Sequence, residues 1–311
     1  MEALLTEAFL TSLLFGAVTA GVPLLLAGLG EQISEKAGVL NIGIEGMMLF
    51  GAYAGFVAAY YSGSFTLGFL MGGVGGMVVA AIVALLCIRY GLNQIVIGIG
   101  VTIGFEGLTA LLHFVQFSKT YPRLDQAPVW ELPGLSALPI IGKALFSHSP
   151  VVYLAVLLVI ALAWLFRSTY IGLNLEAAGA KPAALDAAGV SVTRTRSAAV
   201  LATGFLAGLG GAYMANVGAG LFVPFMTGGA GFIGIVLAML ARGRPIWVLL
   251  GAALFGISLA MTTALQVAGI NIPTDVVQML PFAMVMLVLV VFARHSVLPP
   301  ALGLPYVRGD R

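Results

Sequence analysis

The sequence predicts an all-α polytopic membrane protein with about eight to ten transmembrane helices, at least one of them broken or re-entrant. Of its 311 residues, 60% are hydrophobic and 8% are charged, whereas soluble domains contain roughly 25% charged residues. Apolar stretches long enough to cross a bilayer follow one another along the chain. Many glycines lie four residues apart, as Gly72 and Gly76 or Gly100 and Gly104 do, and this spacing lets membrane helices pack closely.

The predicted spans cover the whole chain and form a single transmembrane domain, residues 1–311. Crossing the hydrocarbon takes about 20 apolar residues, so we expect one short segment, 229–241, to be either a crossing or a re-entrant half-span. In chain order the ranges are 9–29, 39–61, 66–88, 93–117, 151–167, 196–217, 229–241, 246–266 and 276–293.

The positions of lysine and arginine predict which loops face the cytoplasm, because short cytoplasmic loops are enriched in these residues. With residues 168–194 inside, all of the 14 basic residues lie inside except Lys119, Arg123 and Lys143. We therefore expect 168–194 to be a cytoplasmic loop, 118–150 an external loop, and the C-terminus cytoplasmic. The N-terminus then faces outward, provided that 229–241 crosses.

Three acidic residues, Glu45, Glu106 and Asp275, fall within or beside apolar ranges. A charge in the hydrocarbon is costly unless it faces a cavity or a partner. Asn41 lies one turn before Glu45, and the glycines around both permit a broken helix that lines a cavity. For this pair, a structural role and a role in the transport path both remain open. For Glu106 we favour a structural hydrogen bond, and for Asp275 a helix cap.

Motifs for catalysis or metal binding are absent from the sequence. His113, His148 and His295 are scattered, and Cys87 is the single cysteine, so neither a zinc site nor a disulfide is expected. A nucleotide-binding glycine loop and a basic run for nucleic acid are also missing. We expect no catalytic residue, no metal and no cofactor bound by this chain.

The segment GLNLEAAGAKPAALDAAGVS (172–191) is polar but lies between apolar ranges. We expect Gly179 to end one short helix, Pro182 to begin a second, and Gly189 to end it. The resulting elbow has leucines that would be exposed for docking unless the chain's own bundle covers them. These leucines are Leu173, Leu175 and Leu185.

The stretch PLLLAGLGEQISEKAGVLNIGIEGMMLFGAYAG (23–55) resembles a signature of ABC-importer permeases of the branched permease superfamily, which serves branched-chain amino acids, ribose-type sugars and nucleosides. The nucleoside and simple-sugar branch is the most similar. NQIVIG (93–98), the segment 172–191 and GGAGFIGIVLAMLARGRP (228–245) follow in the expected order, so the resemblance covers nearly the whole chain. Glu106 departs from the neutral residues usual in the family.

The resemblance implies a permease subunit that forms the translocation path for a nucleoside or a related purine or simple-sugar solute. A separate cytoplasmic ATPase would bind ATP and magnesium and dock on the segment 172–191. The implied ATPase contacts are Gly172, Asn174, Glu176, Gly179, Pro182 and Gly189. The family's asparagine and glutamate match Asn41 and Glu45, and the candidates for the solute path are Asn41, Glu45, Asn93, Gln94 and Glu106.

The resemblance also implies partners: a second permease subunit in a heterodimer, and an extracytoplasmic solute-binding protein that is lipid-anchored or periplasmic. The protein would lie in a bacterial or archaeal plasma membrane, in contact with lipid and not with nucleic acid. The segments 38–55 and 228–243 are candidates for an internal inverted repeat. The alternative function is an ion-coupled secondary transporter or a channel that uses intramembrane acids.

Overall fold

A computed structural model describes residues 7–131, 133, 134, 136, 138, 140–267 and 298–307, together with the isolated positions 279, 283, 286, 287 and 290. Nearly every element in this part of the chain is a helix, so the predicted all-α polytopic class is confirmed. Asp275 and His295, and most of the predicted span 276–293, lie outside the described residues.

Long apolar helices occupy the ranges in which spans were predicted. Within the described residues, five are long and apolar enough to cross a membrane: α1 (Glu7–Lys36), α3 with its π-helical end η2 (Phe65–Arg89), α4 (Gln94–Phe117), α6 (Pro150–Ser168) and α9 with η3 (Val192–Ala219). Further apolar helices are α2 (Ile44–Ser62), α10 (Ala230–Ala241) and α11 (Pro245–Val267). The number of crossings stays a prediction.

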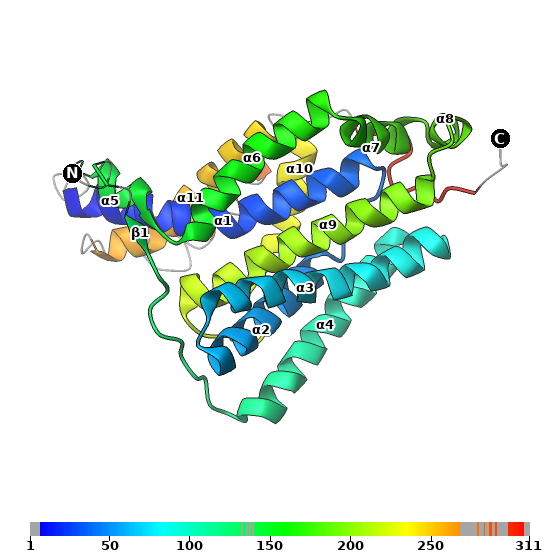
Figure 1. The fold of residues 1–311 in the computed structure, drawn as a ribbon. Helices are drawn as coiled ribbons and strands as arrows, with labels where there is room; N and C mark the ends of the chain where they lie inside the picture. The colour runs from blue at the N-terminus through cyan, green and yellow to red at the C-terminus, as the bar shows by residue number, and fades with distance from the viewer. Residues whose placement is uncertain are drawn as a thin grey trace.

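Two antiparallel neighbours, α1 and α9, run through the middle of the bundle (Figure 1). Helices α10 and α11 pack against α1, while α2 and α3 pack against α9 and α4 packs mainly on α2. One end of the bundle carries α5 (Ile141–Phe146) and the short strand β1 (Trp130–Glu131), which pairs with β2 (Ser147–His148). The opposite end carries α7 (Tyr170–Ala180) and α8 (Pro182–Ala187).

Glycines allow α3 and α9 to approach within backbone contact. A Cβ atom at Gly76 would overlap the carbonyl oxygen of Gly204, so nothing larger than glycine fits without moving a helix. Gly100 and Gly104 on α4 behave differently, since a Cβ at either position would meet open space. Glycine spacing therefore predicted tight packing correctly at the α3–α9 crossing, whereas Gly100 and Gly104 on α4 make no such contact within the described residues of this chain.

Residues 37–43 form a non-helical break between α1 and α2. Gly38 adopts φ +82°, a left-handed conformation that favours glycine. The predicted span 39–61 accordingly begins as this break and becomes helical only at Ile44. At its other end, α1 stays helical through Lys36, seven residues past the end of the predicted range 9–29.

Candidate functional site

Buried polar side chains hold the backbone of the break. Oε1 of Glu31 accepts a hydrogen bond from the Asn41 amide at 3.0 Å, and Oε1 of Gln94 accepts one from the Leu40 amide at 2.9 Å. Backbone N–H groups that leave a helix need such partners when they are buried. Glu31, which the sequence analysis did not single out as an intramembrane acid, is fully buried.

Glu45 joins the start of α2 to the start of α10. Its two carboxylate oxygens accept bonds from the amides of Gly229 and Gly231 at 2.8 and 2.6 Å. The Glu45 side chain is buried, and its negative charge lies at the helix end where the peptide dipoles favour an anion. Of the two roles left open for Glu45, the structure supports a structural one, as the cap of α10.

The five candidates for the solute path divide into two groups. Asn41, Glu45 and Gln94 are buried and surround the break. Asn93 is exposed and caps α4, because its Oδ1 accepts bonds from the amides of Ile95 and Val96 at 2.9 and 3.1 Å. Glu106 lies half-buried along α4.

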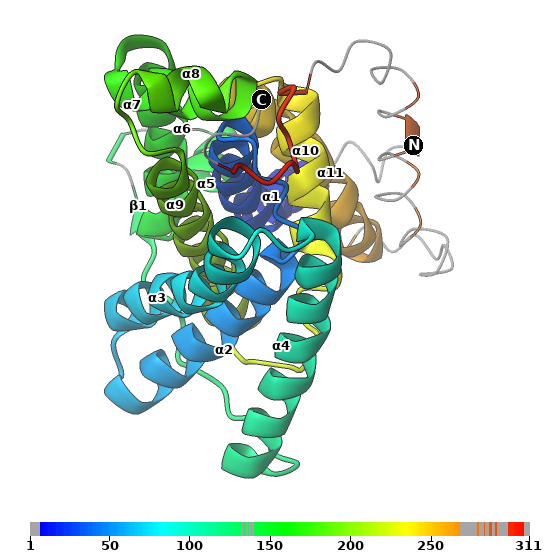
Figure 2. The ribbon, with the colours of Figure 1, turned by 90° about the vertical axis from the view of Figure 1, so that its right-hand side faces the viewer.

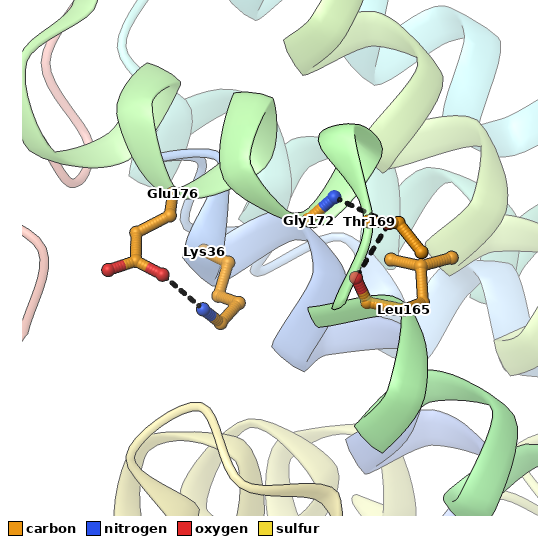
Figure 3. A network of polar contacts seen from close by, with 5 residues as sticks. All are labelled: Lys36, Leu165, Thr169, Gly172 and Glu176. Atoms are coloured by element: carbon orange, nitrogen blue, oxygen red, sulfur yellow. Dashed lines mark hydrogen bonds and ion pairs between the residues drawn. The ribbon is translucent and has the colours of Figure 1, made fainter. Parts of the chain in front are cut away.

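The elbow consists of α7 and α8, largely as predicted. Pro182 stands at the first position of α8, and Gly189, with φ +84°, follows its end. The prediction for Gly179 is wrong, because α7 continues to Ala180. Gly179 instead permits close packing: a Cβ there would overlap the carbonyl oxygen of Lys36. Gly172 lies equally close to the end of α6 (Figure 3).

Two of the three elbow leucines pack on the chain itself. Leu175 and Leu185 are buried, and Leu185 packs with Ala178 and the first residue of α9. Leu173 is 62% exposed. The apolar surface that remains available on α7 is therefore narrower than predicted, and it consists of Tyr170, Ile171 and Leu173.

An ion pair and a buried arginine connect the elbow to the end of α1. Nζ of Lys36 lies 3.0 Å from a carboxylate oxygen of Glu176 (Figure 3). The guanidinium of Arg196, in the first turns of α9, donates to the carbonyl oxygens of Ala37 and Ala178 at 3.1 Å each. It also donates to Leu304 at 2.7 Å, in the segment 298–307 that crosses this end of the bundle (Figure 2). Arg196 thus joins three chain segments.

The sequence analysis used Arg196 only as a positive charge for orientation and did not foresee this role. One signal was present: the arginine stands in the first turns of a predicted span, where a charge needs a partner. Its partners are main-chain oxygens, which every residue carries, so no side-chain pattern marks them.

A profile of the family described as "Branched-chain amino acid transport system / permease component" matches residues 13–289. The chain belongs to this permease family. The permease resembles the putative glucose ABC transporter permease protein of Haloferax volcanii, with 42% identity over 80% of this chain and 76% of the relative. It also resembles the guanosine ABC transporter permease protein of Bacillus subtilis, with 31% identity over 93% and 94%.

Lactococcus lactis contains two related nucleoside ABC transporter permease proteins. One is 32% identical over 92% of this chain and 93% of the relative, and the other is 26% identical over 90% and 79%. These relationships identify the chain as a multi-pass membrane subunit of an ABC transporter and not an enzyme.

Proposed function

We propose that this permease forms the translocation path of an ATP-driven importer for a nucleoside, or for a related purine or simple sugar. Relatives named for guanosine, nucleosides and glucose support this substrate class. The observation that carries the proposal is the elbow α7–α8, which exposes Tyr170, Ile171 and Leu173 while it is fixed to α1 and α9.

The partner at this elbow is a cytoplasmic ABC ATPase that binds ATP and magnesium. Exposed aromatic and aliphatic side chains at the end of a bundle suit a protein groove, because their burial there removes apolar surface from water. The elbow and the C-terminus then face the cytoplasm, in agreement with the excess of basic residues on that side. The plasma membrane of a bacterium or an archaeon is the corresponding location.

Movement of α7 is transmitted to the break, because several contacts hold α7 firmly against the end of α1. The pair Lys36–Glu176, the bonds of Arg196 and the close packing of Gly179 all join α7 to the end of α1. The break is in turn bonded to Glu31 and Gln94. Closure of the ATPase would move these elements together, as alternating access between two states requires.

Two further partners complete the importer. A second, unlike permease subunit is supported by the two different nucleoside permeases of Lactococcus lactis that resemble this chain. An extracytoplasmic solute-binding protein would deliver the solute at the end of the bundle that carries β1 and α5. Because such a protein captures the solute first, it supplies much of the affinity.

The proposal is tested by reconstituting the permease with the ATPase, the second permease and the binding protein in proteoliposomes. We expect ATP-dependent uptake of labelled guanosine or glucose, and none without the ATPase. Leu173→Asp should reduce co-purification of the ATPase about tenfold, because it places a charge in the docking surface. Leu138→Asp is the matched control, because Leu138 is also an exposed leucine and its carbonyl oxygen bonds to Gly142 of α5, at the opposite end. Uptake driven by a proton or sodium gradient without any ATPase would contradict the proposal and favour a secondary transporter.

A further inference from the structure

A cavity of about 290 Å³ lies where α10 ends and α11 begins. The residues that line it are Leu240, Ala241, Arg242, Arg244 and Trp247. This turn lies at the same end of the bundle as the elbow, because a Cβ atom on Gly243 would stand 3.1 Å from Cε of Lys36, the residue that pairs with α7. Two arginines and a tryptophan thus share one hollow at the elbow end.

The backbone of the turn determines where the two arginines stand. Arg242 adopts φ +50° and Gly243 adopts φ +71°. The amide of Arg244 then donates to the carbonyl oxygen of Ala241 at 2.9 Å, and Pro245 begins α11. Left-handed residues end a helix and a proline suits the first turn of the next, so both changes fit within three residues. A short, bonded turn therefore brings the arginines together.

The charge at this cavity is positive and lacks an acidic partner. Arg242 and Arg244 are exposed, and neither forms an ion pair within the part of the chain that the structure describes. The start of α11 adds the positive end of a helix dipole. Guanidinium groups bind phosphate oxygens through paired, charge-assisted hydrogen bonds. The cavity therefore favours a ligand that carries a phosphate group.

An apolar stripe continues from the cavity along α11. Trp247 is exposed in the first turn of this helix, and Leu250, Leu254 and Ile257 are exposed further along it. Their spacing of three, four and three residues places them on one helix face. Such a stripe suits acyl chains, and tryptophan favours the level of the headgroups. A molecule that matches both the cavity and the stripe has an anionic head and apolar tails.

We propose that this cavity binds the headgroup of an anionic phospholipid, with Arg242 and Arg244 at the phosphate and the acyl chains along α11. Basic pockets between membrane helices are typical sites for such headgroups. The inference goes beyond the proposed function, because binding of the lipid requires neither a solute nor an ATPase. It also gives the turn after α10 a role that the excess of basic residues at this end does not assign to any one loop.

The test measures which lipids contact Trp247 in the full-length permease. Trp130→Phe and Trp164→Phe together leave Trp247 as the single tryptophan, and brominated lipids in vesicles then quench its fluorescence. Each arginine near an anionic headgroup contributes about fivefold in affinity, and salt screens part of this effect. Brominated phosphatidylglycerol should therefore associate at Trp247 about tenfold more strongly than brominated phosphatidylcholine.

Variants of the turn separate the contribution of charge from that of the fold. Arg242→Gln combined with Arg244→Gln should abolish the preference for phosphatidylglycerol. The corresponding double lysine variant keeps the charge and should retain most of the preference. Arg167→Gln is the matched control, because Arg167 is an exposed arginine in the last turn of α6 and does not line this cavity. This control should leave the preference unchanged.

Equal quenching by the two lipids, or a preference that survives in the double glutamine variant, would overturn the site. Inorganic phosphate distinguishes a lipid from a free anion: if it removes the preference more strongly than chloride at the same ionic strength, the cavity binds free phosphate and the proposal fails. Reduced co-purification of the ATPase in the glutamine variant, with unchanged lipid contact, would assign this surface to the ATPase instead.

Discussion

Replacing Glu45 by glutamine should destabilise the permease, because Glu45 is the only side chain that the described structure bonds to the start of α10. Both carboxylate oxygens accept backbone amides, from Gly229 and Gly231. Glutamine offers one oxygen and turns an NH₂ group toward the second amide. The substitution therefore removes one charge-assisted bond and places two donors face to face.

The size of the effect follows from these contacts. A hydrogen bond to a charged group contributes about 1.5–3 kcal/mol, and the 2% exposure of Glu45 leaves little room for water to replace it. A change of 1 kcal/mol shifts Tm by about 2–4 °C in a domain of 150–250 residues. Glu45→Gln should thus lower Tm by about 3–12 °C.

Thermal unfolding of the detergent-solubilised permease, followed by tryptophan fluorescence or by loss of the monodisperse elution peak, measures this shift. Glu131→Gln is the matched control, because Glu131 is exposed and such substitutions change stability by about 0.5 kcal/mol or less. Equal Tm values for Glu45→Gln and the parent would refute the assignment of Glu45 as the cap of α10.

Three other outcomes are expected. Gly211→Ala should lower Tm, because its Cβ would overlap the carbonyl oxygen of Met48. Gly100→Ala is the control: its Cβ would meet open space, so Tm should stay unchanged or rise slightly. Equal shifts of Tm in both variants would contradict the packing. Arg196→Lys should reduce ATP-driven uptake at least fivefold while the ATPase still co-purifies. The reason is that one ammonium group cannot reach carbonyl oxygens on three segments. Full uptake in this variant would show that these bonds are dispensable. The folded state lowers the pKa of His148 below its unfolded value near 6.5, so protonation of His148 destabilises the folded state as the pH falls below 6.5. The Tm of the parent should therefore drop between pH 7.5 and pH 5.5, and the drop should be smaller in His148→Gln.

The positions of the helices could be predicted because membrane helices must satisfy their backbone bonds internally and face lipid with apolar side chains. The range 93–117 differs from α4 by one residue at its start, and the range 151–167 differs from α6 by one residue at each end. The prediction for α1 stopped at residue 29 because the next residues are polar. In the structure these residues remain helical, and most are buried: Glu31 bonds to the break and Ser34 bonds to α9.

The candidate site was predicted less completely than the helices. Asn41 and Glu45 stood out because glycines surround them, and the structure does place them at a break. Glu31 did not stand out, because its partner is a main-chain amide of the break, and no side-chain pattern marks such a partner.

The bonds around the break explain how one region can be both well ordered and able to change. Three of the contacts there join a side chain to a backbone group: Glu31 to Asn41, Gln94 to Leu40, and Arg196 to Ala37. A tightly packed apolar crossing such as Gly76 against Gly204 cannot slide without a collision. A carboxylate or guanidinium can exchange one backbone partner for another at small displacement. The break is therefore the part of the bundle best suited to follow α7, while the α3–α9 crossing stays rigid.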